Sequence, residues 1–532
     1  MRCKSTLSAR LAFVALVLGL VLPGSAFSIR SFSSNDNLRV DGGLISGSII
    51  DGVRSYKGIP FAAPPVGDLR WKPPQPVVAW QGVRECNAFG PDCPQAPYPA
   101  GSMYYAAARK QSEDCLYLNV WTNAKAGDKR PVMAWIHGGA LTRGSGATRT
   151  YDGTAFARKG VVLVTINYRL GPLGYLAHPE LTAESPNHSS GNYGVLDQIA
   201  ALKWVQKSIA AFGGDPGRVT IFGESAGSWS VNVLVASPLA KGLFHRAIGE
   251  SGGQFGPGMY LKEDRDKLTS AEKVGAAFAK AAGGVSLKAL RAVPAEKIID
   301  VFNNDSEGKK FRTSPNVDGW VLPDEVRNIF AQGKQNDVPV IVGSNASEMT
   351  TLTNPATWPK TIDEYRKRSE PLYGEAMKDF EVFYPIKSEA DVVTAYLSSL
   401  RDVTFTLPMR TWARMTATRR SKAWLYFFSH VSPNPNSKTL GAYHASEIAY
   451  VFNNLNRQNP LLQEADSKLA EMMASYWVNF ATTGNPNGAG LPKWAPYDRT
   501  SEPYMDFGDP VQLRNHLLKA QLDFLEQFQR RH

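Results

Sequence analysis

Arg218-Val-Thr-Ile-Phe-Gly-Glu-Ser-Ala-Gly-Ser-Trp-Ser230 is the stretch around which the rest of the chain is organised. A β-branched and aromatic run breaks here into a Gly-x-Ser-x-Gly turn and continues as small residues compatible with a helix. The pattern is typical of a nucleophile elbow, in which the central residue, Ser225, has a strained backbone and its hydroxyl projects into a cleft. A five-residue match also fits an ordinary strand–helix connection, but the strand before it and the helix after it favour the elbow.

A second glycine-rich turn precedes the elbow in the chain. Pro131 to Ile136 is an apolar strand that ends in His137-Gly138-Gly139-Ala140. Consecutive glycines leave backbone N–H groups uncovered by side chains, which suits an oxyanion hole as well as a plain turn. The elbow downstream favours the catalytic interpretation.

The apolar runs around the elbow indicate an α/β protein. Val161 to Asn167 is a buried strand, and Val195 to Phe212 has apolar residues at helical spacing. Strand, helix and strand in succession predict a large, mostly parallel sheet flanked by helices, with the elbow at its carboxyl edge. From Ser251 to about residue 330 the pattern is helical and polar, which predicts an insertion that forms one wall of a pocket. Further elements are expected at Gly43 to Phe61, Leu116 to Trp121, Val338 to Gly343, Trp424 to Phe428 and, as a long helix, Leu462 to Thr483.

The length and the first residues of the chain bound its domain organisation. The 532 residues are 43% hydrophobic and 20% charged, which indicates a globular protein with a large core. Because the candidate chemistry runs from residue 138 to residue 444 and must converge, we predict a single domain over residues 27–532. Residues 1–26 combine basic residues, the apolar run Leu11 to Leu22 and small residues, as a cleaved secretory signal does. We therefore expect a secreted or periplasmic protein.

Charge and hydropathy exclude some classes of partner. The formal net charge is +11, and removing the three basic residues of the predicted signal lowers it to +8. No dense Lys/Arg block or nucleic-acid motif accompanies this charge, so a solvated basic surface is favoured and no nucleic-acid partner is expected. The apolar run of the signal is too short to span a bilayer and no later run is longer, so we expect no stable membrane insertion. The sequence does not indicate the oligomeric state.

Four cysteines leave one disulfide possible in the mature chain. Cys3 is removed with the predicted signal, and one of Cys86, Cys93 and Cys115 must then stay unpaired within the chain. An exported protein is expected to form one disulfide from these three thiols.

A serine nucleophile needs a histidine base and a carboxylate, which in this architecture follow in the order Ser, acid, His. That order excludes the early histidines and leaves His430, His444, His516 and His532. His532 ends the chain and His516 is expected in a helical, charged tail, so both are predicted to be solvated. His444 lies in a small-residue loop long enough to reach the sheet edge and is preferred, with His430 as the alternative. Glu348 follows a strand and is the candidate acid. The alternative interpretation is that it is an exposed loop carboxylate with no catalytic role.

Several further stretches resemble the type-B carboxylesterase/lipase family of α/β-hydrolases, which includes cholinesterases, bacterial p-nitrobenzyl esterases and the adhesion proteins called neuroligins. The resemblance extends from about Gly43 to Phe528. Its most specific stretches are Gly58 to Ala62, Ser112-Glu113-Asp114-Cys115 to Val120, Asn167 to Gly171, Phe212 to Pro216, Gly223 to Gly227 and Asn479 to Asn487.

The resemblance implies a set of roles. Ser225 would be the nucleophile, Glu348 the acid and His444 the base. The oxyanion donors would be the N–H groups of Gly139, Ala140 and Ala226. Cys93 and Cys115 would form the family's N-terminal disulfide, and Arg70 and Glu113 a structural ion pair. No cofactor and no metal is implied.

Four residues are expected to shape the substrate pocket. Tyr104 stands near where cholinesterases have a choline-binding tryptophan, which disfavours a choline ester. Trp229 replaces a small residue and would narrow the acyl side. Leu141 and Arg143 follow the oxyanion turn and would line the mouth, where the Arg143 guanidinium would hold a substrate carboxylate. The alternative for Arg143 is a solvated or structurally paired guanidinium.

These inferences predict a serine hydrolase that cleaves a small-molecule carboxylic ester through an acyl-enzyme, with a preference for esters that carry a carboxylate. Two alternatives remain: a lipase acting on longer acyl chains, and a non-catalytic neuroligin-like binding module.

Overall fold

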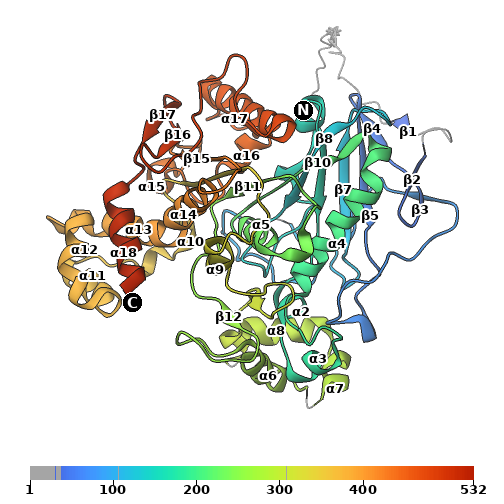
Figure 1. The fold of residues 1–532 in the computed structure, drawn as a ribbon, viewed down its shortest axis with the longest axis horizontal. Helices are drawn as coiled ribbons and strands as arrows, with labels where there is room; N and C mark the ends of the chain where they lie inside the picture. Colours follow the sequence, from blue (N-terminus) through green and yellow to red (C-terminus); the bar gives the residue numbers. More distant parts are fainter. Residues whose placement is uncertain (1–29, 32–36, 106, 285, 307, 532) are drawn as a thin grey trace, which may run out of the picture.

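The computed structural model describes residues 30–31, 37–105, 107–284, 286–306 and 308–531. The predicted signal, residues 1–26, lies outside the described residues. Within them, one mixed sheet of twelve strands forms the centre of the fold, in the spatial order β1-β4-β5-β7-β9-β8-β10-β11-β14-β15-β16-β17 (Figure 1). The strands from β9 to β16 in this order are parallel, and both flanks of the sheet are antiparallel. The prediction of a large, mostly parallel α/β sheet is therefore confirmed.

The strands of this sheet have the following bounds: β1 Arg30–Ser31, β4 Ser48–Ile50, β5 Val53–Pro60, β7 Tyr117–Thr122, β9 Val162–Ile166, β8 Arg130–Ile136, β10 Gly214–Glu224, β11 Arg246–Glu250, β14 Val340–Asn345, β15 Ala423–Phe428, β16 Pro503–Phe507 and β17 Gln512–Asn515. A small separate sheet contains β2 Leu38–Val40, β3 Gly43–Ser46 and β6 Val83–Glu85.

The central strands are buried on both faces because helices cover each side. Along β8, Val132, Ala134 and Ile136 pack in one core cluster, whereas Met133 and Trp135 pack in another. This alternation is the two-residue period of a strand. The first cluster includes residues of α4 Tyr193–Ser208, α5 Ala226–Ala236 and α14 Leu407–Thr416. The second includes residues of α1 Thr154–Arg158, α16 Ile448–Val451 and α17 Glu464–Thr483.

Two groups of helices are inserted beside the sheet (Figure 1). The first is the predicted insertion after Ser251, with β12 Met259–Tyr260, α6 Ala271–Ala281, α7 Leu287–Ala292, α8 Ala295–Asn304, β13 Asn316–Val317 and α9 Val326–Ala331. It lies near α2 Gly171–Tyr175 and α3 Pro179–Glu184. The second contains α10 Met349–Leu352, α11 Ile362–Tyr373, α12 Met377–Phe383 and α13 Glu389–Arg401, with α15 Ser437–Leu440 on the same side. The C-terminal α18 Lys519–Arg531 packs against α11 and α12 in one core cluster.

The sequence analysis did not predict several strands of the central sheet, including β11, β16 and β17. β11 lies directly before the polar insertion, and β16 and β17 follow the strand that was expected to be the last. His516 also lies in a turn between β17 and α18, with a backbone φ of 60°, and not in a helix as expected. None of the helices in the described parts of the chain is both long and apolar enough to cross a bilayer.

Candidate active site

The Gly-x-Ser-x-Gly turn connects β10 directly to α5. Ser225 stands between them with φ 56° and ψ −123°, a region that L-residues rarely occupy. Its N–H donates to the carbonyl oxygen of Glu250 at 2.8 Å, which helps to hold this conformation. A Cβ atom at Gly227 would lie 2.0 Å from the carbonyl oxygen of Ile136, so only glycine fits so close to β8. The predicted strand–turn–helix geometry is present.

The candidate base and acid meet in a buried pair. The Nδ1 atom of His444 lies 2.6 Å from Glu348 Oε2, and the N–H of Asn345 donates to Glu348 Oε1 at 2.7 Å. His444 is 4% exposed and Glu348 is not exposed. The two loops that carry them are joined where the Ser347 N–H donates to the carbonyl oxygen of Ala442 at 2.9 Å. Because Nδ1 faces the carboxylate, Nε2 is the ring nitrogen left to face the elbow.

Glu224, the residue before Ser225, also faces this imidazole. Its Oε1 atom lies 3.1 Å from His444 Nε2. A Cβ atom at Gly138 would lie 3.0 Å from Glu224 Oε2 and 3.1 Å from Ser225 Cβ, so the first glycine turn adjoins the elbow. Within the described residues no hydrogen bond joins the Ser225 hydroxyl to His444. Such bonds often form only when the substrate is bound.

Three further buried glutamates share this region, and the sequence analysis did not single them out. Burial, together with the neighbouring carboxylates, raises the pKa of Glu224 and Glu250 well above its ordinary value. The same causes raise the pKa of Glu447 to about 8. Trp477 Nε1 donates to Glu250 Oε1 at 2.8 Å. These shifts favour neutral side chains at neutral pH. The only sequence feature that could have indicated these glutamates is their position: Glu224 precedes Ser225, and Glu447 follows His444 by three residues.

The first glycine turn has an unusual backbone with three successive positive φ values. Gly139, Ala140 and Leu141 have φ values of 104°, 55° and 59°. The N–H groups of Thr142 and Arg143 each donate to the Gly139 carbonyl oxygen at 3.0 Å and close the turn. Across the described part of the chain, the N–H groups of Gly139, Ala140 and Ala226 donate to no protein acceptor. They are free for a ligand.

The four predicted pocket residues differ in their surroundings. Tyr104 donates its hydroxyl to the His444 carbonyl oxygen at 2.9 Å, so it adjoins the candidate base. Trp229 lies one turn after Ser225, with its indole against Gly252, where a Cβ atom would be 2.8 Å from Trp229 Cδ1. Leu141 was expected at the pocket mouth, but it is fully buried in the core, and the Gly171 N–H donates to its carbonyl oxygen at 2.7 Å.

Arg143 is partly held by the protein. Its Nε donates to the Ala96 carbonyl oxygen at 3.1 Å, and its guanidinium lies over the Tyr98 ring at 5.5 Å. The structural pairing considered as the alternative is thus present on one side of the guanidinium. The terminal nitrogens of Arg143 bond no acceptor in the described residues.

Both ring nitrogens of His430, the alternative base, contact aspartate oxygens. Its Nε2 lies 2.9 Å from Asp466 Oδ1 and its Nδ1 lies 2.8 Å from Asp509 Oδ2. A histidine bound by acceptors at both nitrogens cannot take a proton from serine without losing one of these bonds. The geometry therefore favours His444.

The disulfide and the ion pair implied by the resemblance are both present. Cys93 and Cys115 are bonded, with their Cα atoms 5.0 Å apart, and Cys86 is free and buried. Burial raises the pKa of the Cys86 thiol to about 12. Arg70 Nε donates to Glu113 Oε2 at 2.7 Å, and Arg70 Nη1 donates to the carbonyl oxygens of Arg291 and Val293. The disulfide loop, residues 93–115, is thereby tied to the first insertion.

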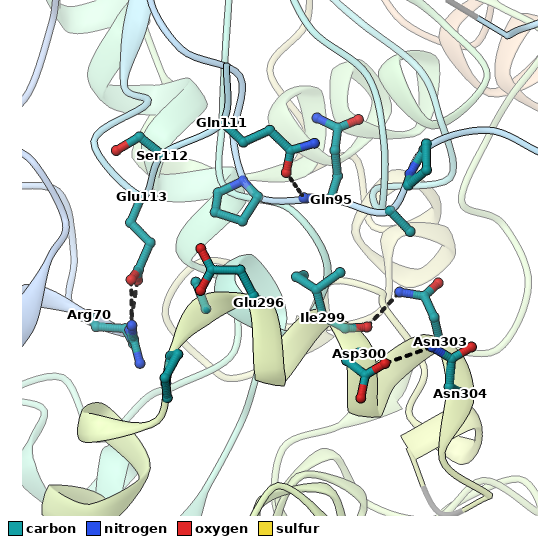
Figure 2. Close-up of a pocket in the computed structure, with 15 residues that line it drawn as sticks. Arg70, Gln95, Gln111, Ser112, Glu113, Glu296, Ile299, Asp300, Asn303 and Asn304 are labelled. Atoms are coloured by element: carbon teal, nitrogen blue, oxygen red, sulfur yellow. Dashed lines mark hydrogen bonds and ion pairs between the residues drawn. The ribbon is translucent and has the colours of Figure 1, made fainter. Parts of the chain in front are cut away.

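A cavity of about 590 Å³ lies between the disulfide loop and α8 (Figure 2). Gln95 and Gln111 line one wall, and Glu296 and Asp300 of α8 line the other. Ser225, Glu348 and His444 do not line it, so it is separate from the candidate catalytic centre. No cluster of three or more His, Cys, Asp or Glu side chains suited to a metal ion occurs in the part of the chain that the structure describes.

Comparison with known proteins gives consistent matches over most of the chain. The model of the carboxylesterase family matches residues 34–525. The chain is 40% identical over 474 residues to the fumonisin B1 esterase of Sphingopyxis macrogoltabida, covering 86% of this chain and 84% of that one. It is 34% identical over 487 residues to the para-nitrobenzyl esterase of Bacillus subtilis (strain 168), covering 89% and 95%. Among solved structures, a thermophilic pNB esterase superposes with a TM-score of 0.80 at 32% identity, covering 92% of this chain and 99% of that one.

Proposed function

The chain belongs to the carboxylesterase family of serine hydrolases, and we propose that this carboxylic-ester hydrolase works through a triad of Ser225, His444 and Glu348. The observation that carries the proposal is the buried contact of 2.6 Å between His444 Nδ1 and Glu348 Oε2, beside the strained elbow. A carboxylate at Nδ1 fixes the imidazole tautomer and stabilises its protonated form.

The proposed reaction has two halves. His444 Nε2 takes the hydroxyl proton of Ser225 while Ser225 Oγ attacks the ester carbonyl carbon. The tetrahedral intermediate collapses, and the alcohol leaves with the proton from His444. A water molecule then gives a proton to His444 and attacks the acyl carbon. As this second intermediate collapses, the bond to Ser225 Oγ breaks, Ser225 Oγ takes the proton back from His444, and the acid leaves.

The proposed oxyanion hole consists of the N–H groups of Gly139, Ala140 and Ala226. Their lack of protein acceptors and the unusual φ values of the turn support this role. Ala226 is the first residue of α5, so the positive end of the helix adds to the field at the oxyanion.

Covalent labelling tests the nucleophile. A fluorophosphonate should add one label to the wild-type chain, and peptide mapping should find it on Ser225. Ser225→Ala should take up no label, whereas Ser230→Ala, on the same helix, should be labelled normally, because the Ser230 hydroxyl bonds the Ala226 carbonyl oxygen at 3.0 Å. Labelling of Ser225→Ala at another serine would refute the triad.

For the substrate, we propose an ester that carries a free carboxylate near the scissile bond. The terminal nitrogens of Arg143 support this, since they follow the oxyanion turn and bond no acceptor among the described residues. Arg143→Ala should lower kcat/KM for a carboxylated ester by roughly 10-fold or more, as for a hydrogen bond to a charged group, and should spare its neutral analogue. An equal loss on both substrates would assign Arg143 a structural role. One relative is named for an esterase activity on fumonisin B1.

The lipase alternative predicts a different preference for acyl chain length. Trp229 packs beside Ser225 and supports a narrow acyl side. We therefore expect kcat/KM to fall as the acyl chain lengthens. In Trp229→Ala, kcat/KM should fall less steeply with acyl chain length. A wild-type preference for long acyl chains would favour the lipase. The non-catalytic alternative is not retained, because it requires the loss of a triad member, whereas Ser225, Glu348 and His444 are all present and His444 Nδ1 lies 2.6 Å from Glu348 Oε2.

We further propose that residues 1–26 are a cleaved secretory signal, that residues 27–532 form one domain, and that the protein is secreted or periplasmic. The disulfide between Cys93 and Cys115 is consistent with an oxidising compartment. N-terminal sequencing of the exported protein tests this: a first residue other than one near Phe27 would contradict the proposed cleavage.

A further inference from the structure

The hydroxyl of Tyr98 lies beside the proposed oxyanion turn. A Cβ atom at Gly139 would be 3.2 Å from Tyr98 Oη, so the hydroxyl occupies the space that a side chain at Gly139 would enter. Tyr98 belongs to the disulfide loop and is half-buried. The sequence analysis did not select it, because its approach to Gly139 depends on how that loop folds back over the sheet edge.

This hydroxyl differs from those of the neighbouring tyrosines. Tyr104, whose ring centroid lies 5.8 Å from that of Tyr98, bonds the His444 carbonyl oxygen and Thr351. Tyr168 donates to the His137 carbonyl oxygen at 2.8 Å. The Tyr98 hydroxyl makes no hydrogen bond to any other described residue. It is therefore available to donate to a bound substrate.

The charges around Tyr98 make it a donor. Burial raises its pKa, the Glu224 carboxylate raises it further, and the Arg143 guanidinium lowers it. The phenol consequently stays protonated at neutral pH. The guanidinium over the ring withdraws electron density and strengthens the hydroxyl as a hydrogen-bond donor.

The segment that carries Tyr98 is bonded to the oxyanion turn. Gln95 Nε2 donates to the Gly144 carbonyl oxygen at 2.9 Å, and the Gly144 N–H donates to Gln95 Oε1 at 2.8 Å. The Gln95 N–H also donates to Gln111 Oε1 at 2.9 Å, on the side of the cavity (Figure 2). With the bond from Arg143 to Ala96, these contacts fix the hydroxyl relative to the turn before a substrate arrives.

We infer that the Tyr98 hydroxyl is a side-chain donor to the ester carbonyl oxygen as that oxygen becomes negatively charged, adding to the three backbone N–H groups. The inference rests on the proposed function, since it requires attack by Ser225 at this place. A donor aimed at the oxyanion acts on the transition state more than on the bound substrate.

Tyr98→Phe tests the inference, because it removes one oxygen and keeps the ring under Arg143 and against Tyr104. We expect kcat to fall roughly 10- to 100-fold with little change in KM, as for a lost hydrogen bond to a charged group. Affinity for a trifluoromethyl ketone, which forms a hemiketal oxyanion on the serine, should fall by the same factor. The matched control is Tyr105→Phe, whose side chain on the same loop is 57% exposed and should leave both values unchanged.

Unchanged kcat in Tyr98→Phe would overturn the inference. So would a lower kcat with unaltered affinity for the ketone, because that result would separate the hydroxyl from the oxyanion. Fluorophosphonate labelling separates this failure from that of the triad: wild type and Tyr98→Phe should both be labelled at Ser225, whereas no label at Ser225 in wild type would refute the proposed function itself.

Discussion

Two buried histidines lie on loops beyond the same strand, β15, but they differ in how many ring nitrogens are hydrogen-bonded. His444 hydrogen-bonds a carboxylate at Nδ1 only: its Nε2 lies 3.1 Å from Glu224 Oε1, an atom that has no hydrogen-bond partner among the described residues. His430 has an aspartate at each ring nitrogen. A histidine that transfers protons needs one nitrogen accessible to the substrate, whereas a histidine that joins segments uses both. The difference separates a site arranged for chemistry from one arranged for stability.

The carboxylates around the two histidines also differ. Near His444, burial and neighbouring carboxylates raise the pKa of Glu224 and Glu447. Near His430, burial alone would raise the pKa of Asp466, but hydrogen bonds from Tyr450 and His430 hold it below its ordinary value. The two regions should therefore respond to pH in opposite directions.

The largest expected effect separates the two histidines by activity. His444→Ala should lower kcat by roughly 10⁴-fold or more, as should Ser225→Ala, because members of a triad act as a unit. Ser225→Ala should keep the urea midpoint of wild type, since the hydroxyl serves the reaction rather than the core, whereas His444→Ala should lower it, because the buried Glu348 loses its imidazole partner. Steady-state kinetics with a p-nitrophenyl ester measures this, and substantial turnover in either variant would contradict the triad.

Glu348→Gln should have a smaller effect on the same reaction. The amide is nearly isosteric but does not stabilise a protonated imidazole, and it can support the wrong tautomer. We expect kcat to fall by roughly 10³-fold, with KM little changed. Activity equal to wild type would mean that Glu348 is a structural residue and that another carboxylate serves His444.

His430→Ala should keep the activity that His444→Ala loses. The change leaves Asp466, which is 3% exposed, without its imidazole partner, although Tyr450 still donates to it at 2.7 Å. We expect the free energy of unfolding to fall by about 2–3 kcal/mol, as for a buried charge that loses one partner. The kcat should stay near that of wild type. A loss of activity with full stability would mean that the two histidines were assigned the wrong way round.

The sequence predicted those parts of the site that depend on local order. The elbow around Ser225 is encoded within five residues, and the chain order Ser, acid, His left Glu348 as the candidate acid and His444, with His430 as the alternative, as the candidate base. The choice between His444 and His430 became firm only with the partners of His430, which come from α17 and the turn after β16. Such contacts between distant segments leave no local pattern.

The misplaced residue and the missed residues were mispredicted for the same reason: their positions depend on how the chain folds and packs. Leu141 follows the oxyanion turn in sequence, but its left-handed backbone turns the side chain into the core. Tyr98 and Glu250 approach Gly139 and Trp477 only after the loops and helices pack. β16 and β17 carry polar and charged residues among the apolar ones, because they lie toward the edge of the sheet, so their pattern is weaker than that of the central strands.

The smallest expected effect concerns the pH dependence of stability and uses the contrast between the two sets of carboxylates. The pKa of Glu447 is raised from 4.5 to about 8 in the folded protein. Because the unfolded chain ionises first, the contribution of Glu447 to stability is complete below pH 4.5 and is lost as the pH rises through 8. Glu447→Gln does not ionise, so its Tm should decline less than that of wild type across this range. Asp466→Asn is the matched control. The lowered pKa of Asp466 stabilises the fold at pH values above the ordinary pKa of an aspartate, and this stabilisation is lost as the pH falls. The Tm of this variant should therefore depend less on pH than that of wild type at acidic pH only. Melting curves of wild type and Glu447→Gln that run parallel from pH 4.5 to 8 would show that the glutamates around His444 ionise freely in the folded protein.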